Sequence, residues 1–353
     1  MTAKHEITMP ARKHGIESMI KTRYIKPLLY VMCLICACLT PTHAAERPDS
    51  IARLGTSSSG STYYIIANGI GELLHKHANI NMTAEPIGGS YANIFSMMAN
   101  KVDYAITNSG AAFDAYNVVP PFTEKATIGM VAQGQTSLRF ILVRKDSEIK
   151  SLQDLNEKII IGQRPALPEM SQIADALIKA ANLTDLRIVS TKDTRESLRH
   201  IVSGTVDGII IPGGLRLPAV VQLFREGLVE LLDIDAETIA KMQADLPQYM
   251  FTQTIPAGHF EGQQRDATVF GLNTYLVAAL DAPEDQVYKV TRTLFENLEE
   301  FGALHSEAKA WTMKNTLSEP LIPYHPGAIR YFQETNVWTQ QMQLLQNRLL
   351  MPQ

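Results

Sequence analysis

Apolar positions along this 353-residue chain alternate between strand-like runs and helix-like spacings. After a short apolar run at residues 51–54 and a loop of small residues, apolar side chains recur with helical spacing at Tyr63, Ile66, Ala67, Ile70 and Leu74. Further apolar runs predict strands at 138–143, 158–161, 187–190 and 229–233. Helical patterns occupy 151–155, 168–181, 217–227 and 235–246, and a capping box at 281–284 opens a helix that ends at Gly302. Alternating strands and helices predict an α/β fold with mostly parallel sheets flanked by helices.

Part of this pattern occurs twice, at an offset of 104 residues. Residues 99–106 resemble residues 203–210, and each segment follows an amphipathic helix and carries Val-Asp before an apolar strand. Asn100 and Gly204 suit a left-handed helix cap. Adding the same offset to Gly60, in the first small-residue loop, gives Arg164, which lies in a second loop that also leads into a helix. We predict two similar α/β units, and chance similarity of a short Val-Asp pattern is the alternative.

The loop at residues 55–62 is the first candidate site. A helix start leaves backbone N–H groups without intrahelical partners, and the helix dipole adds partial positive charge there. Such a position favours an anion such as a carboxylate or phosphate. A capped helix behind an ordinary Ser-rich turn explains the same residues and remains the alternative.

The first 44 residues have the pattern of a secretory signal peptide. A basic stretch precedes an apolar run at residues 27–39, which is short for a membrane span, and small residues precede Ala45. We therefore expect cleavage of residues 1–44 and release into the periplasm, with Met19 as a candidate for the true start. An uncleaved anchor helix is the alternative. Lipid attachment at Cys38 is not expected, because the residues before it form a poor lipidation box.

Loss of this leader changes the charge and the available chemistry. It removes six basic and two acidic residues and leaves 26 Lys and Arg against 34 Asp and Glu, a net charge of −8, which argues against nucleic acid as a partner. All three cysteines lie in the leader, so the mature chain has no disulfide and no thiol chemistry. His75 and His77 face different directions on a helix, and the other histidines are isolated, so we expect neither a metal nor a cofactor.

A series of short segments then carries a resemblance to one family of receptors. They are Gly55–Tyr64, Ile87–Ser90 with Asn93, Val102–Ser109, Leu142–Ser147 with Ile149–Leu155, Ile255–Gly258, Leu294–Asn297 and His325–Ala328. Each segment is a weak signal, but together and in this order they resemble the TAXI-type solute-binding proteins, the extracytoplasmic receptors of a class of TRAP transporters. The resemblance covers residues 51 to about 333.

The resemblance implies a type II periplasmic binding-protein fold of the α/β class, with two lobes joined by a crossover-strand hinge. Lobe 1 would comprise residues 46–139 and 271–353, and lobe 2 residues 140–270. It also implies a small carboxylate ligand, such as glutamate, 2-oxoglutarate or another organic acid, bound in a cleft between the lobes. The partner would be a TRAP membrane permease, fused or in two subunits, and we expect a monomer without enzymatic activity.

The expected ligand-binding residues follow from the matched loops. In lobe 1 they are hydroxyl and backbone donors, namely Ser58, Ser59, Gly60, Ser61, Thr62, Tyr63, Ser90, Asn108 and Ser109. In lobe 2, which would close over the ligand, they are Gln163, Arg164, Pro212, Gly213 and Gly214. Closure of this kind requires a ligand that binds the closed state better than the open one.

One loop departs from the family pattern. Where the family has a Gly-Ser-Gly-Thr-like sequence before Glu, this chain has residues 165–168, Pro-Ala-Leu-Pro, before Glu169. Proline offers no N–H, so the loop has fewer backbone donors, and Leu167 could narrow the pocket or favour an apolar ligand group. Arg164 could restore the positive charge with bidentate geometry, and a solvent-facing Arg164 is the alternative. The identity of the ligand is therefore open.

Two other functions fit parts of the sequence. A binding protein that stands alone or feeds a sensor would carry the same motifs. A periplasmic hydrolase could place a nucleophile in the Ser-rich loop, but the chain has no Gly-x-Ser-x-Gly elbow and no His beside a carboxylate in an evident motif.

Overall fold

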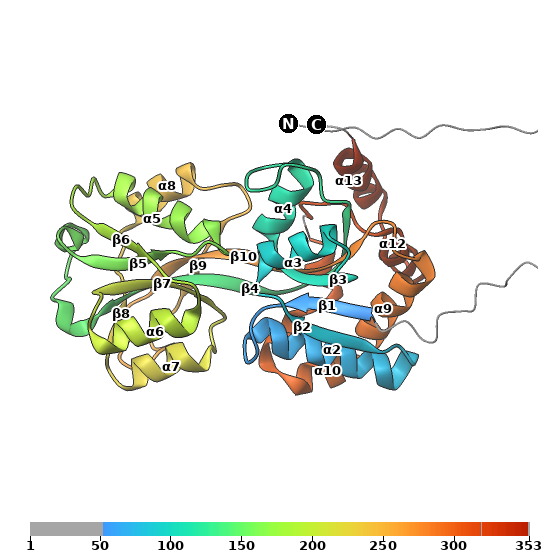
Figure 1. Ribbon diagram of the computed structural model, residues 1–353, viewed down its shortest axis with the longest axis horizontal. Coiled ribbons are helices and arrows are strands. Elements are labelled where there is room, and N and C mark those ends of the chain that lie inside the picture. The colour runs from blue at the N-terminus through green and yellow to red at the C-terminus, as the bar shows by residue number, and fades with distance from the viewer. Residues whose placement is uncertain (1–51, 319, 352–353) are drawn as a thin grey trace, which may run out of the picture. The chain divides into compact units, whose positions relative to one another are not determined.

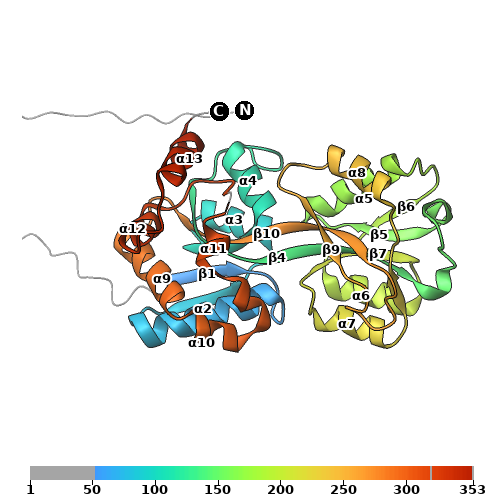
Figure 2. The ribbon, with the colours of Figure 1, turned by 180° about the vertical axis from the view of Figure 1, so that it is seen from behind.

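The computed structural model describes residues 52–318 and 320–351 (Figures 1 and 2). The predicted signal peptide, residues 1–44, the candidate start at Met19 and Cys38 lie outside these residues. Within the described residues, no helix combines the length and the apolar character that crossing a membrane requires.

The described residues begin with a βαβαβα unit. Its elements are β1 (Ala52–Thr56), α2 (Thr62–Ala78), β2 (Met82–Pro86), α3 (Ser90–Met98), β3 (Tyr104–Asn108) and α4 (Ser109–Asn117). The helix predicted from the spacing after Tyr63 is α2, whose apolar face, including Ile66, Ile70 and Leu74, is buried. Asn79 ends it in the left-handed conformation, a cap that Asn tolerates.

The long strand β4 (Ile128–Arg144) then leads into a second, similar unit. It contains η2 (Lys145–Ser147), η3 (Leu152–Leu155), β5 (Ile159–Gln163), α5 (Pro168–Ala180), β6 (Arg187–Ser190), α6 (Thr194–Ser203), β7 (Gly208–Gly213), α7 (Pro218–Arg225), β8 (Val229–Leu231), α8 (Ala236–Asp245) and β9 (Phe251–Ile255). Figure 1 shows α5 and α8 on one face of its sheet and α6 and α7 on the other.

A second long strand, β10 (Ala267–Ala279), returns the chain to the first unit. The remaining elements are α9 (Glu284–Glu296), α10 (Leu298–Leu304), η4 (Ser306–Ala310), α11 (Met313–Thr316), α12 (Pro326–Glu334) and α13 (Gln340–Leu350). Figure 2 shows these C-terminal helices beside α2, β1 and α4.

The sheet order reflects the internal repeat. Among the described residues, ten strands form one sheet with the main order β2-β1-β3-β10-β4-β7-β5-β6, in which β8 also pairs with β4 and β9 with β10. In the first unit β1 pairs in parallel with β2 and β3, and in the second β5 pairs in parallel with β6 and β7. The parallel pairs are therefore peripheral. The two long strands in the middle pair antiparallel with each other and with β3 and β7.

The hydrophobic core is divided in the same way. One cluster draws its residues from 52–132 and 275–332, and we call the part built around it lobe 1. Two further clusters, one on each face of the second half of the sheet, draw theirs from 138–272, and we call that part lobe 2. Both long strands contribute to cores in both lobes, so they are the crossing strands. The boundaries expected at residues 139/140 and 270/271 remain a prediction.

Two details of the predicted helices are wrong. The helix expected to open with a capping box at 281–284 begins at Glu284, and its N-cap position is Pro283, which makes no side-chain cap hydrogen bond. The same helix does not end at Gly302, because it breaks at Asn297 and α10 follows. Asn297 has φ −123° and ψ 32°, outside the helical region, so backbone geometry ends α9 there.

Candidate functional site

A cluster of buried charged side chains lies where the two lobes meet. It consists of Arg139 on β4, Arg164 in the loop between β5 and α5, and Glu169 in the first turn of α5. Arg139 and Glu169 are each 1 % exposed and Arg164 is 8 % exposed. Charged side chains are buried to this extent only when they are paired or serve a ligand, so the cluster is the candidate site.

Glu169 links the lobes through one of its oxygens. Its Oε1 accepts a hydrogen bond from Nδ2 of Asn108 in lobe 1, at 3.1 Å, and an ion-pair hydrogen bond from Nη2 of Arg139. Its Oε2 is also buried, and within the part of the chain that the structure describes it has no hydrogen-bond partner. Glu169 thus retains an acceptor without a hydrogen bond, and Nε of Arg139, on the same guanidinium edge as Nη2, is also buried without a partner among the described residues.

Arg164 has the complementary arrangement. Its Nη1 donates to Oγ1 of Thr194 at 3.2 Å, at the start of α6, while Nε and Nη2 are buried without a partner among the described residues. Nε and Nη2 form one edge of the planar guanidinium, the fork that binds a carboxylate with two hydrogen bonds. Burial and, to a smaller extent, the charge of Arg139 lower the pKa of Arg164 to about 10. An anion bound at this fork would offset both the burial of the guanidinium charge and its repulsion by Arg139.

A group of hydroxyls lies next to Arg139. Nη1 of Arg139 donates to Oγ of Ser137 at 2.8 Å, and the Tyr63 hydroxyl is 3.3 Å from Oγ1 of Thr274. Tyr63 is half-buried as a residue, but burial of its hydroxyl raises its pKa, and the neighbouring Arg139, Thr274 and Ser90 only partly offset this. Tyr63 is therefore a neutral hydroxyl that can donate at physiological pH.

A second contact between the lobes lies near Glu169. Asp114 on α4 accepts from the Tyr91 hydroxyl at 2.5 Å, and the hydroxyl of Tyr249, in lobe 2, lies 3.3 Å from the same Oδ2. Burial raises the pKa of Asp114, and both tyrosine hydroxyls counteract the increase. The Tyr249 hydroxyl is also 3.4 Å from Oε1 of Gln172 on α5. The contact between Tyr249 and Asp114 joins lobe 2 to α4.

The predicted Ser-rich loop behaves as a helix cap at its end. Oγ of Ser61 accepts from the backbone N–H of Tyr64 at 3.2 Å, and Ser61 N donates to the Ser58 carbonyl at 3.0 Å. Residues 58–60 are exposed, and Ser61 and Thr62 are half-buried. Ser61 thus satisfies one of the helix N–H groups that the anion-site prediction left free.

Ser90, Asn108 and Ser109 are buried, and each has a structural role. Ser90 Oγ accepts from Asn108 N at 2.9 Å, and Ser109 Oγ accepts from Asn273 N at 3.1 Å. Asn108 caps α4 by accepting from Ala111 N at 2.7 Å. Of this group, Asn108 reaches the charged cluster directly.

The predicted lobe-2 residues divide into two groups. Arg164 is buried in the cluster, so the solvent-facing alternative is wrong, while Gln163 beside it is exposed. Pro212 pairs with Arg139 across β7 and β4, so this strand end borders the cluster. Gly214 is buried against Glu307 of lobe 1, and a Cβ at residue 214 would clash with that carboxylate. Gly213 packs against Leu217.

The expectation that Leu167 narrows the pocket is wrong. Leu167 is 9 % exposed and belongs to the lobe-2 core with Met170 and Ile173. The Pro-Ala-Leu-Pro loop therefore turns its large apolar side chain inward, toward its own lobe. This packing also leaves Arg164 as the charged side chain that this loop brings to the cluster.

Sequence reasoning missed Arg139 and Glu169 as site residues. Arg139 interrupts the apolar run at 138–143, and a charge inside a buried strand was the available signal. Glu169 follows Pro168 at the helix start, where an acidic residue is ordinary because it complements the helix dipole. No feature of the sequence marked Ser137 or Thr274 as a site residue.

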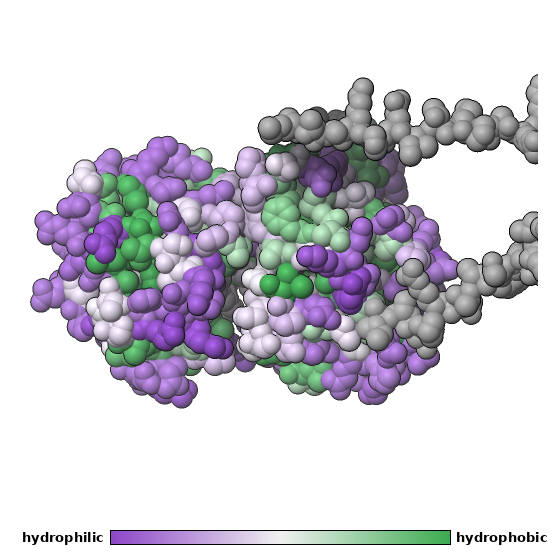
Figure 3. Space-filling view, viewed as in Figure 1, coloured by the Kyte–Doolittle hydropathy of each residue, from purple (hydrophilic) through white to green (hydrophobic). Residues whose placement is uncertain are grey.

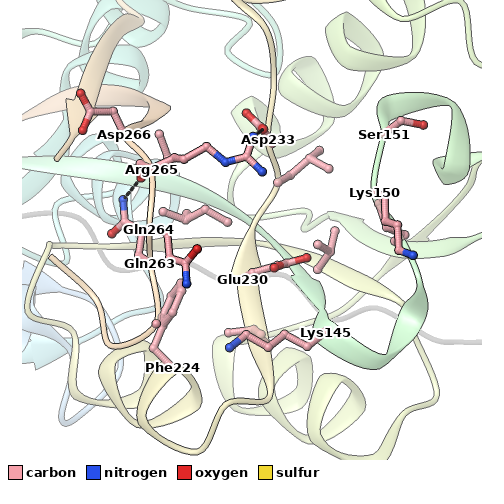
Figure 4. Close-up of a pocket in the computed structure, with 17 residues that line it drawn as sticks. Lys145, Lys150, Ser151, Phe224, Glu230, Asp233, Gln263, Gln264, Arg265 and Asp266 are labelled. Carbon is pink, nitrogen blue, oxygen red and sulfur yellow. Dashed lines mark hydrogen bonds and ion pairs between the residues drawn. The ribbon is translucent and has the colours of Figure 1, made fainter. Parts of the chain in front are cut away.

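A hollow in lobe 2 offers a different environment (Figure 4). It has a volume of about 640 Å³ and is lined by residues of η2, β8 and the segment 262–267. Arg265 and Asp233, which face each other there, form an ion pair at 2.7 Å, and both are exposed. Because this ion pair is exposed to solvent and its members are already paired, the hollow differs from the cluster between the lobes, whose donors are buried and unpartnered.

Neither the surface hydropathy nor the arrangement of potential metal ligands points to a second site among the described residues. Figure 3 shows hydrophilic and hydrophobic residues interspersed over both lobes. Among residues 52–318 and 320–351 there is no group of three or more His, Cys, Asp and Glu side chains arranged to hold a metal ion. The charged cluster between the lobes is therefore the arrangement that calls for a ligand.

Residues 54–335 match the model of the NMT1-like family. This chain belongs to the NMT1-like family. The match spans most of the described residues and includes the whole charged cluster. It is coarser than the TAXI resemblance, which remains a prediction for this NMT1-like protein.

Solved structures identify the fold of this NMT1-like protein. The protein MatC from Rhodopseudomonas palustris with bound malate is 16% identical, with a TM-score of 0.52, over 85% of this chain and 98% of that chain. The periplasmic binding protein BugD is 12% identical, with a TM-score of 0.51, over 85% and 97%. At these identities the likeness concerns the fold. The NMT1-like protein thus has the two-lobed α/β fold of type II periplasmic binding proteins, as predicted.

Proposed function

We propose that this protein is an extracytoplasmic solute receptor that binds a small carboxylate between its lobes. The observation that carries the proposal is Arg164, a buried guanidinium whose Nε and Nη2 edge has no partner among the described residues. A carboxylate that accepts both N–H groups would satisfy them in a low-dielectric site. The malate named with MatC is a carboxylate of this class, which agrees with the proposal.

The site proposed for this ligand combines expected and added residues. Arg164 supplies the fork, Tyr63, Ser90 and Asn108 line the lobe-1 side, and the remaining lobe-1 candidates are secondary. Arg139 and Glu169 join the site because they share the cluster with Arg164. The contacts of Asn108 with Glu169 and of Asp114 with Tyr249 would form as the lobes close over the ligand.

Delivery to a TRAP-type secondary transporter completes the proposal. It rests on the TAXI resemblance and on the receptor fold. Uptake of a radiolabelled ligand into cells should require both this receptor and a TRAP permease, and collapse of the ion gradient should abolish it. Uptake that persists without the ion gradient but requires ATP hydrolysis would contradict a TRAP partner.

Calorimetry with a panel of small carboxylates tests the ligand site. Arg164→Ala should weaken binding about 100-fold or more, because a buried anion would lose its paired charge. Arg164→Lys should be intermediate, since an ammonium keeps the charge but loses the fork. Arg195→Ala is the matched control, because Arg195 is an exposed arginine next to Thr194. Undiminished affinity in Arg164→Ala would contradict the proposed site.

A further inference from the structure

Glu169 is one of three buried groups in the cluster whose hydrogen bonding is incomplete among the described residues, beside Arg164 and Nε of Arg139. Oε1 accepts from Asn108 and from Arg139, whereas Oε2 has no donor in the described part of the chain. As the partner of a guanidinium, Glu169 is a carboxylate, which accepts hydrogen bonds and cannot donate. A buried carboxylate oxygen without a donor is costly.

Arg164 and Glu169 complement different parts of one small molecule. Arg164 presents two N–H donors, which suit a carboxylate, and Glu169 presents a lone acceptor, which suits an O–H or N–H. They belong to one cluster, because α5 begins four residues after Arg164 and because the charge of Glu169 acts on Arg164. A ligand with a carboxylate alone would leave Oε2 of Glu169 unsatisfied.

We infer that Glu169 is a specificity-determining residue that selects carboxylates bearing a hydrogen-bond donor, a hydroxyl or an amine, over the matching oxo acids. This inference rests on the proposed carboxylate-binding function. An oxo acid presents only acceptors, so its carbonyl would face the Glu169 carboxylate, and two acceptors cannot form a hydrogen bond. Sites built to hydrogen-bond a substrate O–H or N–H discriminate strongly against analogues that lack it.

The fixed partners of Oε1 make one substitution especially informative. In Glu169→Gln the amide oxygen remains the only atom able to accept from Arg139 and Asn108, so it should occupy the position of Oε1. The amide NH₂ then takes the position of Oε2 and turns the acceptor into a donor. The variant should therefore prefer the oxo acid.

The experiment is calorimetry with two matched sets of probes, lactate, alanine and pyruvate, and 2-hydroxyglutarate, glutamate and 2-oxoglutarate. In the unsubstituted protein the hydroxy or amino member of the bound set should bind at least about tenfold more tightly than the oxo member. In Glu169→Gln this preference should reverse. Comparison of the hydroxy acid with the amino acid in each set shows whether the site prefers a neutral O–H donor or a cationic N–H donor. Glu237→Gln, an exposed glutamate on α8 paired with Lys241, is the control and should keep the original preference.

The possible outcomes are distinct. Equal binding of the donor-bearing and oxo probes by the unsubstituted protein, or an unchanged preference in Glu169→Gln, would overturn the inference and leave the proposed function standing. Failure of every small carboxylate in the panel to bind would overturn the proposed function itself. If Glu169→Gln does not fold, the unsubstituted protein still tests the inference, because equal binding of the donor-bearing and oxo probes would overturn it.

Discussion

Asp103 and Asp207 hold equivalent positions in the two halves of the sheet. Oδ2 of Asp103 accepts from the backbone N–H of Arg53 at 2.8 Å, and Oδ2 of Asp207 accepts from that of Ile159 at 2.8 Å. Each aspartate N–H donates back to the carbonyl of the same residue, at 2.9 and 2.7 Å respectively. Each side chain thus joins β3 or β7 to the first strand of its unit. This shared role supports the duplication predicted from the repeated Val-Asp pattern.

Replacing either aspartate should destabilise the protein by a similar amount. Asp103→Ala and Asp207→Ala should each lower the free energy of unfolding by about 1–2 kcal/mol, because each leaves a strand N–H without its acceptor. Urea unfolding followed by circular dichroism measures the change. Asp185→Ala, at an exposed aspartate, is the control and should stay within about 0.5 kcal/mol. A loss at only one of the two positions would contradict their equivalence.

Local pattern was enough to predict most of the secondary structure. The strand at 187–190 and the helix at 168–181 match β6 and α5 to within a residue, because apolar periodicity and the proline at the helix start are local signals. Asn100 and Gly204 adopt positive φ, as expected of left-handed caps. The break at Asn297 was missed because apolar spacing continues through it into α10.

The candidate site was only partly predictable, because its key contacts are not local. Glu169 meets Arg139, 30 residues earlier, and Asn108, 61 residues earlier. Arg164 was found because the repeat placed its loop opposite the first one. Arg139 was hidden inside an apolar run, where the strand pattern gave no indication of which side chains it would meet.

The buried pair of Arg139 and Glu169 should show strong coupling in a double-mutant cycle. Arg139→Met alone should cost about 3–5 kcal/mol of stability, because it leaves a buried carboxylate without its counter-charge. The double variant Arg139→Met, Glu169→Met should cost much less than the sum of the single changes. Denaturant unfolding of the four proteins gives the coupling energy. Additive effects would show that the two charges do not depend on each other.

His325 should make stability depend on pH. It is 1 % exposed, its Nδ1 accepts from Gly327 N at 3.0 Å at the start of α12, and burial lowers its pKa to about 4. Because the unfolded chain takes up a proton near pH 6.5 and the folded one only near pH 4, this group's contribution to stability is complete above pH 6.5. It is lost as the pH falls toward 4, by up to about 3 kcal/mol.

His325→Asn should reduce this acid sensitivity, since asparagine can cap the helix but does not titrate in this range. Thermal or urea unfolding at pH 7 and pH 4.5 measures the difference between the two proteins. His75→Asn, an exposed histidine on α2, is the control and should keep the pH dependence of the unsubstituted protein. An identical loss of stability on acidification in His325→Asn would show that other groups cause it.

Gly214 should control how closely the lobes can approach. A methyl group at this position would clash with the Glu307 carboxylate on the opposite lobe. For the lobes to close, the methyl group must displace the flexible end of the Glu307 side chain, so Gly214→Ala should weaken ligand binding by up to about tenfold, with little change in the stability of either lobe. Glu307→Ala should restore affinity when combined with Gly214→Ala, since it removes the obstructing group.

Gly162→Ala is the matched control for this test. Its Cβ would press on Ala174 and Ile188, which belong to the same lobe, so it should lower stability without a specific loss of affinity. Calorimetry with the tightest-binding carboxylate gives the affinities, and small-angle X-ray scattering with and without that ligand reports closure. If Gly214→Ala binds as tightly as the unsubstituted protein, the contact between residue 214 and Glu307 does not limit closure, and the binding-competent state keeps the lobes further apart.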